Sequence, residues 1–526
     1  MSQVDLYDTS LRDGMQGQGM SLSAAEKLRV VRALDALGVA FIEAGFPASN
    51  PKEAELFALL AEVELETAVI CAFGMTRRRG LDAAADPGLA TLVASAAPVC
   101  TLVGKTWGLH IEKVTRVSRE ENLAMISDSV SFCRAHDKRV IYDAEHFFDA
   151  YREHPGYALE CLGAAVSAGA ENVTLCDTNG SSLPQQVATA TADAVAALGD
   201  GAVVGIHTHN DAECGVANSL AGVEAGARLV QGTLNGRGER CGNANLVSVL
   251  PALQLKLGYS CVAPERLGLL TETSHLFDEL TNITPDADQP YVGRNAFAHK
   301  GGMHVAGIQA DSRTFEHVDP AQVGNGREVL ISELAGRGSI AQRARELGVD
   351  LGPAGAARAV EQIKQREHRG YHYEVADASF ELLLRREAGQ YKPLFRLESF
   401  RVIVEKRADG QVETEATIKI WVGGRRFVRT AEGSGPVNAL DRALREAIGE
   451  LHPELARIEL ADYKVRILDS HQGTGSVTRV LLDTSDGQAS WGSIGVSENI
   501  IEASWEALVD SLEYAFQPRT AAVRNE

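Results

Sequence analysis

The sequence predicts a (β/α)8 TIM barrel, followed by a helical linker region and a C-terminal α+β regulatory domain, within 526 residues. Eight β-like runs alternate with eight helix-like segments over residues 1–260. Strands separated by helices pair in parallel through right-handed crossovers, and eight such units in about 250 residues are what a closed barrel requires. An open doubly wound sheet is the alternative, but no GxGxxG motif opens the first unit.

The elements follow in order along the barrel region. Strands are expected over residues 4–7, 40–44, 68–73, 99–103, 139–142, 172–175, 203–206 and 228–232. The helices after them are expected over residues 23–37, 51–61, 81–89, 120–135, 157–168, 184–197, 212–225 and 244–256. The first helix has a defined start, because Ser23 and Glu26 have the spacing of a capping box.

The pattern changes twice beyond the barrel. Residues 261–392 form the linker region, with helices expected over 264–278 and 356–367. The regulatory domain covers residues 393–518, where strands alternate in period two. Its strands are expected over 400–405, 413–422, 463–468, 476–483 and 489–496, and its helices over 437–451 and 500–516. Strands followed by a helix, twice over, predict a separate α+β domain.

Charge, hydropathy and cysteine usage limit the class of protein. The formal net charge of −20 argues against nucleic acid as a partner, because phosphate binding requires a basic surface. No apolar run reaches the length of a membrane helix, and the first residues show no secretory signal. The eight cysteines include no CxxC pair, which is typical of reduced thiols. We therefore expect a cytoplasmic enzyme with no membrane partner.

Polar segments follow the first, fifth, sixth, seventh and eighth expected strands. In a (β/α)8 barrel, catalytic residues lie at the carboxyl ends of the strands, so these segments share one face. The segments are DTSLRDG at 8–14, DAE at 143–145, DTN at 177–179, HTHND at 207–211 and NGRGERCGN at 235–243.

His207 and His209 are the strongest candidates for metal ligands. Residues i and i+2 of a strand point to the same side, so two imidazoles can bind one ion. Asp13 and Asn243 are expected on the same face, and this mixed N and O set favours Mn²⁺, Mg²⁺ or Zn²⁺ in a catalytic site. The alternative is that both histidines are buried in the core with satisfied hydrogen bonds.

Arg12 and Glu145 are candidates for the chemistry beside the metal. A guanidinium next to Asp13 suits a developing oxyanion or enolate, and the alternative is a surface ion pair. Glu145 could act as an acid or base, and the alternative is a carboxylate at a helix start.

Four motifs together resemble the metal-dependent acyl transferases and lyases related to isopropylmalate synthase, homocitrate synthase and citramalate synthase. The motifs are DTSLRDGMQ at 8–16, HTHND at 207–211, GRGERCGN at 236–243 and HKGGMH at 299–304. The likeness covers almost the whole chain, and the C-terminal domain resembles the regulatory domain of this family.

The resemblance implies a role for each matching residue. Asp13, His207, His209 and Asn243 would bind the metal, which holds a 2-oxo acid. Arg12 would polarise its carbonyl, and Thr178 would bind its carboxylate. Glu145 and His304 would remove a methyl proton from acetyl-CoA. In relatives the histidine of the post-barrel motif reaches the other subunit, so a homodimer is implied.

Three segments resemble the branch of the family that condenses acetyl-CoA with pyruvate, giving (R)-2-methylmalate for isoleucine synthesis. They are GKTWGLH at 104–110, GRGERC at 236–241 and SELAG at 332–336. The resemblance makes Lys105 and His110 candidate contacts to the substrate or to CoA, and the alternative is that both are structural. One departure is that some relatives place a tyrosine shortly after the post-barrel histidine, whereas the nearby aromatic residue here is Phe315. Isoleucine is the expected effector, near the glycine-rich segments 433–435 and 473–475.

Three other functions stay open from the sequence. Isopropylmalate or homocitrate synthase would differ only in the pocket for the oxo-acid side chain. A carbon–carbon lyase would need only the barrel. A non-catalytic amino-acid sensor is a different class, and the intact Arg12, Asp13, His207 and His209 count against it.

Overall fold

The computed structural model describes residues 2–47, 49–299, 304, 307–308, 310–329, 337–468 and 476–517. The chain forms two compact units. The first contains Met1–Ala298 and Glu316–Glu328, and the second contains His299–Phe315 and Val329–Glu526. Residues 300–303 of the HKGGMH motif and the whole of the segments at 332–336 and 473–475 lie outside the described residues.

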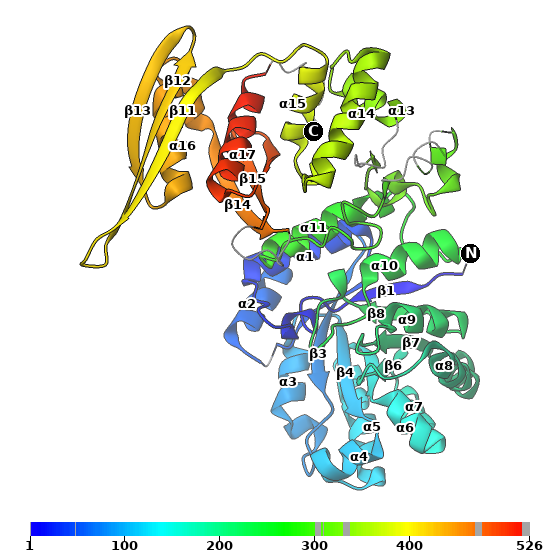
Figure 1. Ribbon diagram of the computed structural model, residues 1–526. Coiled ribbons are helices and arrows are strands. Elements are labelled where there is room, and N and C mark those ends of the chain that lie inside the picture. Colours follow the sequence, from blue (N-terminus) through cyan, green and yellow to red (C-terminus); the bar gives the residue numbers. More distant parts are fainter. Residues whose placement is uncertain are drawn as a thin grey trace. The chain divides into compact units, whose positions relative to one another are not determined.

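The first unit is a closed barrel of eight parallel strands, which confirms the predicted fold class (Figure 1). The strands neighbour one another in chain order, and β8 closes the ring on β1 by pairing Leu229 with Asp5. The strands are β1 Asp5–Asp8, β2 Phe41–Gly45, β3 Val69–Met75, β4 Val99–Lys105, β5 Arg139–Glu145, β6 Asn172–Asp177, β7 Val203–Thr208 and β8 Leu229–Gly232.

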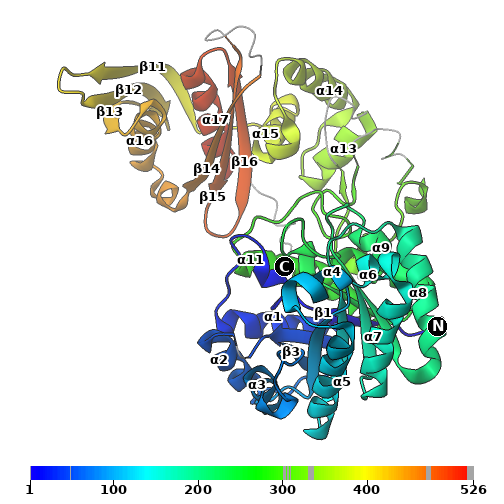
Figure 2. The same cartoon turned by 90° about the horizontal axis from the view of Figure 1, so that it is seen from below.

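Helices surround this barrel, and α2, α3, α5 and α7 lie on its outside in both views (Figures 1 and 2). The helices are α1 Ala24–Leu37, α2 Pro51–Leu60, α3 Pro87–Ala94, α4 Gly108–His110, α5 Arg119–Ala135, α6 Phe147–Glu153, α7 Pro155–Ser167, α8 Pro184–Leu198, α9 Gly215–Glu224, α10 Leu246–Pro251 and α11 Leu270–Leu280. Several differ from expectation. Helices α4 and α6 were not predicted, and α3 begins only at Pro87, near the end of the helix expected over 81–89. The helix expected over 244–256 ends at Pro251 and continues as a π turn.

Helix α1 illustrates how local sequence determines an element. The predicted capping box is present: the Ser23 hydroxyl accepts from the Glu26 N–H, and the Glu26 carboxylate accepts from the Ser23 N–H. Gly38 ends the helix in the left-handed region, with φ of +93°. Between these ends, Val30, Leu34 and other apolar residues are buried against the barrel core.

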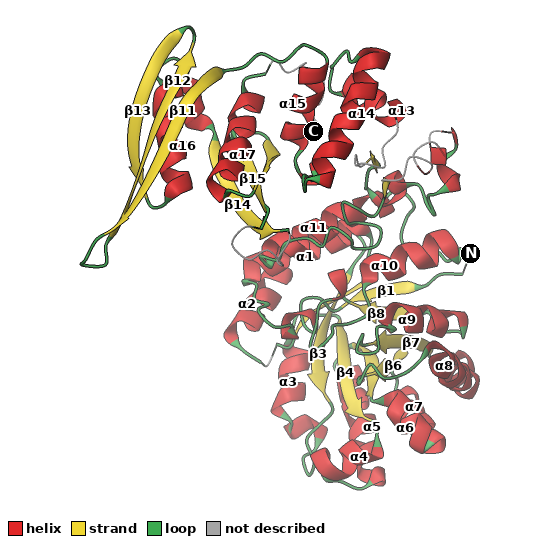
Figure 3. Ribbon diagram, in the orientation of Figure 1, coloured by secondary structure: helices red, strands yellow, loops and turns green. Residues whose placement is uncertain are grey.

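The second unit contains α13 Arg337–Glu346, α14 Gly352–His368 and α15 Asp377–Glu387, followed by two modules of the same order (Figure 3). Each module is a three-stranded antiparallel sheet with a helix packed on it. The modules are β11 Phe395–Lys406, β12 Val412–Val422, β13 Arg425–Gly433 and α16 Pro436–Gly449, then β14 Glu459–Ile467, β15 Thr478–Ser485, β16 Ser490–Ser497 and α17 Ile500–Ala515. Strand β13 was not predicted, because charged residues dominate its start.

We expect Leu34→Ala to lower the free energy of unfolding of the barrel unit by about 3 kcal/mol. The side chain is completely buried, so its truncation leaves a cavity between α1 and the barrel. Urea unfolding followed by circular dichroism measures the change. Arg32→Ala, on the exposed face of the same helix, is the control. Equal losses in the two variants would contradict this packing.

Candidate active site

The candidate site lies at the carboxyl ends of the barrel strands. Side chains alternate along a strand, so residues of one parity point into the barrel. In β5, Val140 and Tyr142 belong to the core between sheet and helices, and Ile141 belongs to a separate cluster drawn from strands. Asp143 and Glu145 share the parity of Ile141 and line a cavity of about 300 Å³.

The structure brings three of the four predicted metal ligands together around this cavity. One ligand atom from each of Asp13, His207 and His209 lies within 4.8 Å of the others. The Nε2 of His207 is 3.4 Å from Oδ2 of Asp13. All three side chains are buried, so they face one another rather than bulk water.

The neighbouring charges shift the pKa values of the carboxylate and of one imidazole in this cluster. Burial alone would raise the pKa of Asp13, but Arg12 and His207 more than offset it and hold that pKa well below its usual range. Burial and the neighbouring His207 lower the pKa of His209 to about 4. His209 is therefore neutral near pH 7, which is the form that binds a metal.

Gln231 orients the ring of His207. The Gln231 Nε2 donates to Asp143 Oδ1 at 2.9 Å, so its Oε1 is the atom that faces His207. His207 Nδ1 lies 2.7 Å from this oxygen and must donate to it. His207 Nε2 is then the nitrogen that faces Asp13 and the cavity, and in the neutral ring its lone pair is available to a metal.

Asn243 and His209 carry buried atoms that suit a cation. The Asn243 amide nitrogen donates to the Arg237 carbonyl at 3.2 Å, which leaves Asn243 Oδ1 on the other side. Within the described residues, Asn243 Oδ1 and His209 Nδ1 are buried without a hydrogen-bond partner. The two residues are neighbours through a backbone bridge. Unsatisfied buried acceptors are costly, so these residues fit a metal ion.

Arg12 is held beside this cluster by Glu43, a residue that sequence reasoning missed. Its Nε lies 2.5 Å from Glu43 Oε2, its Nη1 lies 3.3 Å from Asp13 Oδ2, and its guanidinium stacks on Phe73 at 4.0 Å. A surface ion pair is excluded, because Glu43 is completely buried. A glutamate within an otherwise apolar strand was the signal that could have found it.

Glu145 lines the cavity and pairs with Lys105, which lines it too. Both are therefore placed where the sequence predicted. The ring of His110 lies next to that of His146, with centroids 4.2 Å apart, and stacks on Trp107. His110 does not itself line this cavity among the described residues, and its role as a substrate contact stays a prediction.

Thr178 follows β6 and faces the cavity with an oriented hydroxyl. The backbone N–H of His146 donates to Thr178 Oγ1 at 2.8 Å, so the hydroxyl proton is free to donate to an anion. His146 has a left-handed backbone, with φ of +57°, and its Nδ1 contacts Asp149 at 3.1 Å. His146 was missed by sequence analysis, although it follows Glu145 directly.

His304 belongs to the second unit. Its exposed ring stacks on Phe315, with centroids 4.2 Å apart. The aromatic ring next to His304 therefore has no hydroxyl. The predicted roles of His304 in proton removal and in the partner subunit stay predictions.

Comparison with known proteins identifies the family. The HMGL-like family profile matches residues 3–273. The chain belongs to the HMGL-like family. Beyond this HMGL-like barrel, a homocitrate synthase post-HMGL domain-like profile matches residues 291–370, and the LeuA allosteric (dimerisation) domain profile matches residues 374–516.

Several relatives match this HMGL-like chain over nearly its full length. An (R)-citramalate synthase from Streptomyces coelicolor is 50% identical and covers 97% of this chain and 96% of its own length. An (R)-citramalate synthase from Synechocystis sp. is 46% identical, and the match covers 99% of this chain and 97% of the relative. A probable 2-isopropylmalate synthase from Methanopyrus kandleri is 33% identical, and the match covers 96% of this chain and 97% of the relative. Across the described residues, no helix is both long and apolar enough for a membrane crossing.

We expect Gln231→Leu to weaken Mn²⁺ binding about 10- to 100-fold, because His207 loses the acceptor that fixes its tautomer. Electron paramagnetic resonance titration of the metal-free protein measures the affinity. His207→Ala should abolish the site, and Gln185→Leu on the exposed face of α8 is the control. Unchanged Mn²⁺ affinity in a folded Gln231→Leu protein would refute the assignment.

Proposed function

We propose that this chain is an (R)-citramalate synthase, which condenses acetyl-CoA with pyruvate to give (R)-2-methylmalate and CoA. One observation carries the choice within the family. Five relatives named (R)-citramalate synthase are 41–50% identical over at least 97% of this chain, and one named putative (R)-citramalate synthase is 32% identical. Relatives named 2-isopropylmalate synthase reach 32–33% over a similar length. The chain is an acyltransferase in which the acetyl group becomes an alkyl group.

Asp13, His207, His209 and Asn243 would hold a divalent metal, Mn²⁺, Mg²⁺ or Zn²⁺. When bound, such an ion makes the oxo carbon of pyruvate electrophilic. This proposal is supported by the oriented lone pair of His207 and by the unpartnered acceptors of His209 and Asn243. An anion-binding function in a chain of net charge −20 requires local cations, and a metal with Arg12 supplies them.

Arg12 and Thr178 would bind the two polar groups of the oxo acid, its carbonyl and its carboxylate. Arg12 keeps part of its guanidinium toward the cavity that it lines, where negative charge develops on the carbonyl oxygen. Thr178 donates its free hydroxyl proton to the carboxylate of pyruvate. Because Glu43 and the His146 N–H hold these groups before substrate arrives, little reorganisation is needed.

Glu145 and His304 would remove a proton from the acetyl methyl group. The resulting enolate carbon bonds to the oxo carbon, and the oxo oxygen becomes an alkoxide that takes up a proton. Water then cleaves the thioester, which releases CoA. Lys105 lies against Glu145 and keeps its carboxylate oriented toward the cavity that both residues line.

The second unit would regulate the enzyme and join two chains in a homodimer. The profile match to the LeuA allosteric (dimerisation) domain over residues 374–516 supports this proposal. Isoleucine, the end product that (R)-2-methylmalate serves, is the effector to test. We further propose a cytoplasmic location and the domain division 1–260, 261–392 and 393–518.

A substrate panel tests the function. We expect release of CoA from acetyl-CoA to be fastest with pyruvate, compared with 2-oxobutyrate, 2-oxoisovalerate and 2-oxoglutarate. The assay follows the free thiol in the presence of Mn²⁺ or Mg²⁺, and chiral chromatography identifies the product. Preference for 2-oxoisovalerate would make the chain a 2-isopropylmalate synthase. No metal-dependent release with any oxo acid would favour a non-catalytic sensor.

We expect Thr178→Val to raise the KM for pyruvate about tenfold or more, because a hydrogen bond to a charged group is lost. Thr178→Ser keeps the hydroxyl and is the matched control, with a KM close to that of the wild type. Steady-state kinetics at saturating acetyl-CoA separate the two. Equal effects of valine and serine would show that Thr178 acts through packing rather than through its hydroxyl.

A further inference from the structure

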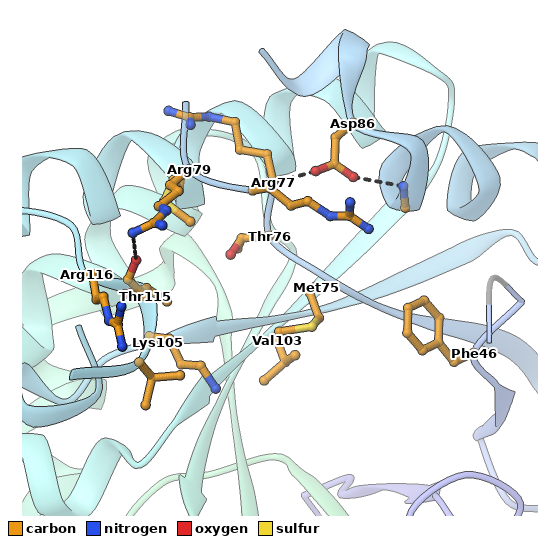
Figure 4. A pocket seen from close by; sticks show the side chains of 14 residues that line it. Phe46, Met75, Thr76, Arg77, Arg79, Asp86, Val103, Lys105, Thr115 and Arg116 are labelled. Carbon is orange, nitrogen blue, oxygen red and sulfur yellow. Dashed lines mark hydrogen bonds between the residues drawn. The ribbon is translucent and has the colours of Figure 1, made fainter. Parts of the chain in front are cut away.

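A second cavity, of about 380 Å³, shares a wall with the candidate active site (Figure 4). Met75, Val103 and Lys105 line both cavities. The second cavity is otherwise built by the segments that follow β3 and α4, together with parts of α3 and α5. A ligand whose reactive end lies in the active site can therefore extend past this wall into the second cavity.

Four arginines line the second cavity: Arg77, Arg78, Arg79 and Arg116. Arg77 is already neutralised, because its buried guanidinium pairs with Glu121 and Asp128, each at 2.8 Å. Arg77 therefore holds the segment after β3 against α5, and its charge is not available to a ligand.

The other three arginines are not paired with an acidic side chain among the described residues. Within the described part of the chain, the side chains of Arg78 and Arg116 form no hydrogen bond or ion pair. Arg79 reaches only the carbonyl oxygen of Thr115, at 3.4 Å. All three side chains are exposed. Uncompensated cations gathered at one cavity of a chain with a net charge of −20 mark a place for an anion.

Apolar surface lies beside these cations. Met75 is 51% exposed and Val114 is 59% exposed, and both line the cavity. In Figure 4, Arg79, Thr115 and Arg116 lie on one side, Phe46 lies on the other, and Met75 and Val103 lie between them. The cavity thus suits a ligand that combines phosphates with a long, weakly polar arm.

We propose that this second cavity binds the nucleotide half of CoA, with Arg78, Arg79 and Arg116 facing its phosphates. Guanidinium groups bind phosphate through paired, charge-assisted hydrogen bonds. The pantetheine arm crosses the shared wall at Met75 and Val103, so that the acetyl group enters the metal-lined cavity. The identity of the thioester rests on the proposed function, whereas the preference for a phosphorylated ligand rests on the arginines.

The double variant Arg79→Gln/Arg116→Gln tests the proposal in the full-length enzyme. We expect the KM for acetyl-CoA to rise about tenfold to a hundredfold, because contacts to charged phosphates are lost. The kcat and the KM for pyruvate should stay within about twofold of the wild type. Arg29→Gln/Arg32→Gln removes the same charge from the exposed face of α1 and should leave the KM for acetyl-CoA unchanged.

S-acetylpantetheine, which has no phosphates, separates phosphate binding from effects on folding or chemistry. The double variant should use it as well as the wild type does. An unchanged KM for acetyl-CoA, or an equal loss with both thioesters, would overturn the proposal.

Calorimetric titration with CoA distinguishes failure of this proposal from failure of the proposed function. Arginine-dependent CoA binding by a protein that turns over no oxo acid would support the cavity assignment and sink the proposed function. An active enzyme whose double variant binds CoA as tightly as the wild type would sink the cavity assignment alone. A wild type that binds no CoA would overturn both.

Discussion

The buried carboxylate of Glu43 is the constraint on which the mouth of the barrel depends. An anion inside a protein costs several kcal/mol unless other groups pair with it and donate hydrogen bonds to it. Here Tyr7 and Arg12 donate to it, and Thr9 donates at 2.5 Å. These donors come from β1 and the segment after it. The carboxylate of Glu43 on β2 therefore holds the loop that follows β1 in place.

A second chain of buried hydrogen bonds crosses the barrel axis. Gln231 links Asp143 on β5 to His207 on β7, and each hydrogen bond in this chain has only one possible direction. The result is a histidine with a defined tautomer and a fixed ring plane. The orientation of His207 therefore depends on Gln231, a fully buried side chain behind it, and the barrel strands hold Gln231 in place.

The sequence predicted the barrel and the metal cluster because both follow from short-range periodicity. Eight strand–helix units define the fold, and the i and i+2 relation of His207 and His209 needs only one strand. Glu43 and Gln231 could not be predicted in the same way, since their partners lie 31 and 24 residues away. Helix α6 and strand β13 were missed for a local reason. The first begins directly after the left-handed His146, and the second begins with two charged residues, Arg425 and Arg426, which interrupt the period-two pattern.

The shared wall of Met75 and Val103 links two properties of the enzyme that are often treated as separate. A side chain trimmed there to admit a bulkier oxo acid also changes the passage of the thioester arm. Selectivity for the oxo acid and affinity for the thioester are therefore expected to change together during evolution. Designers who wish to broaden the range of oxo acids have more freedom at Thr178, which lines the active-site cavity but not the second cavity.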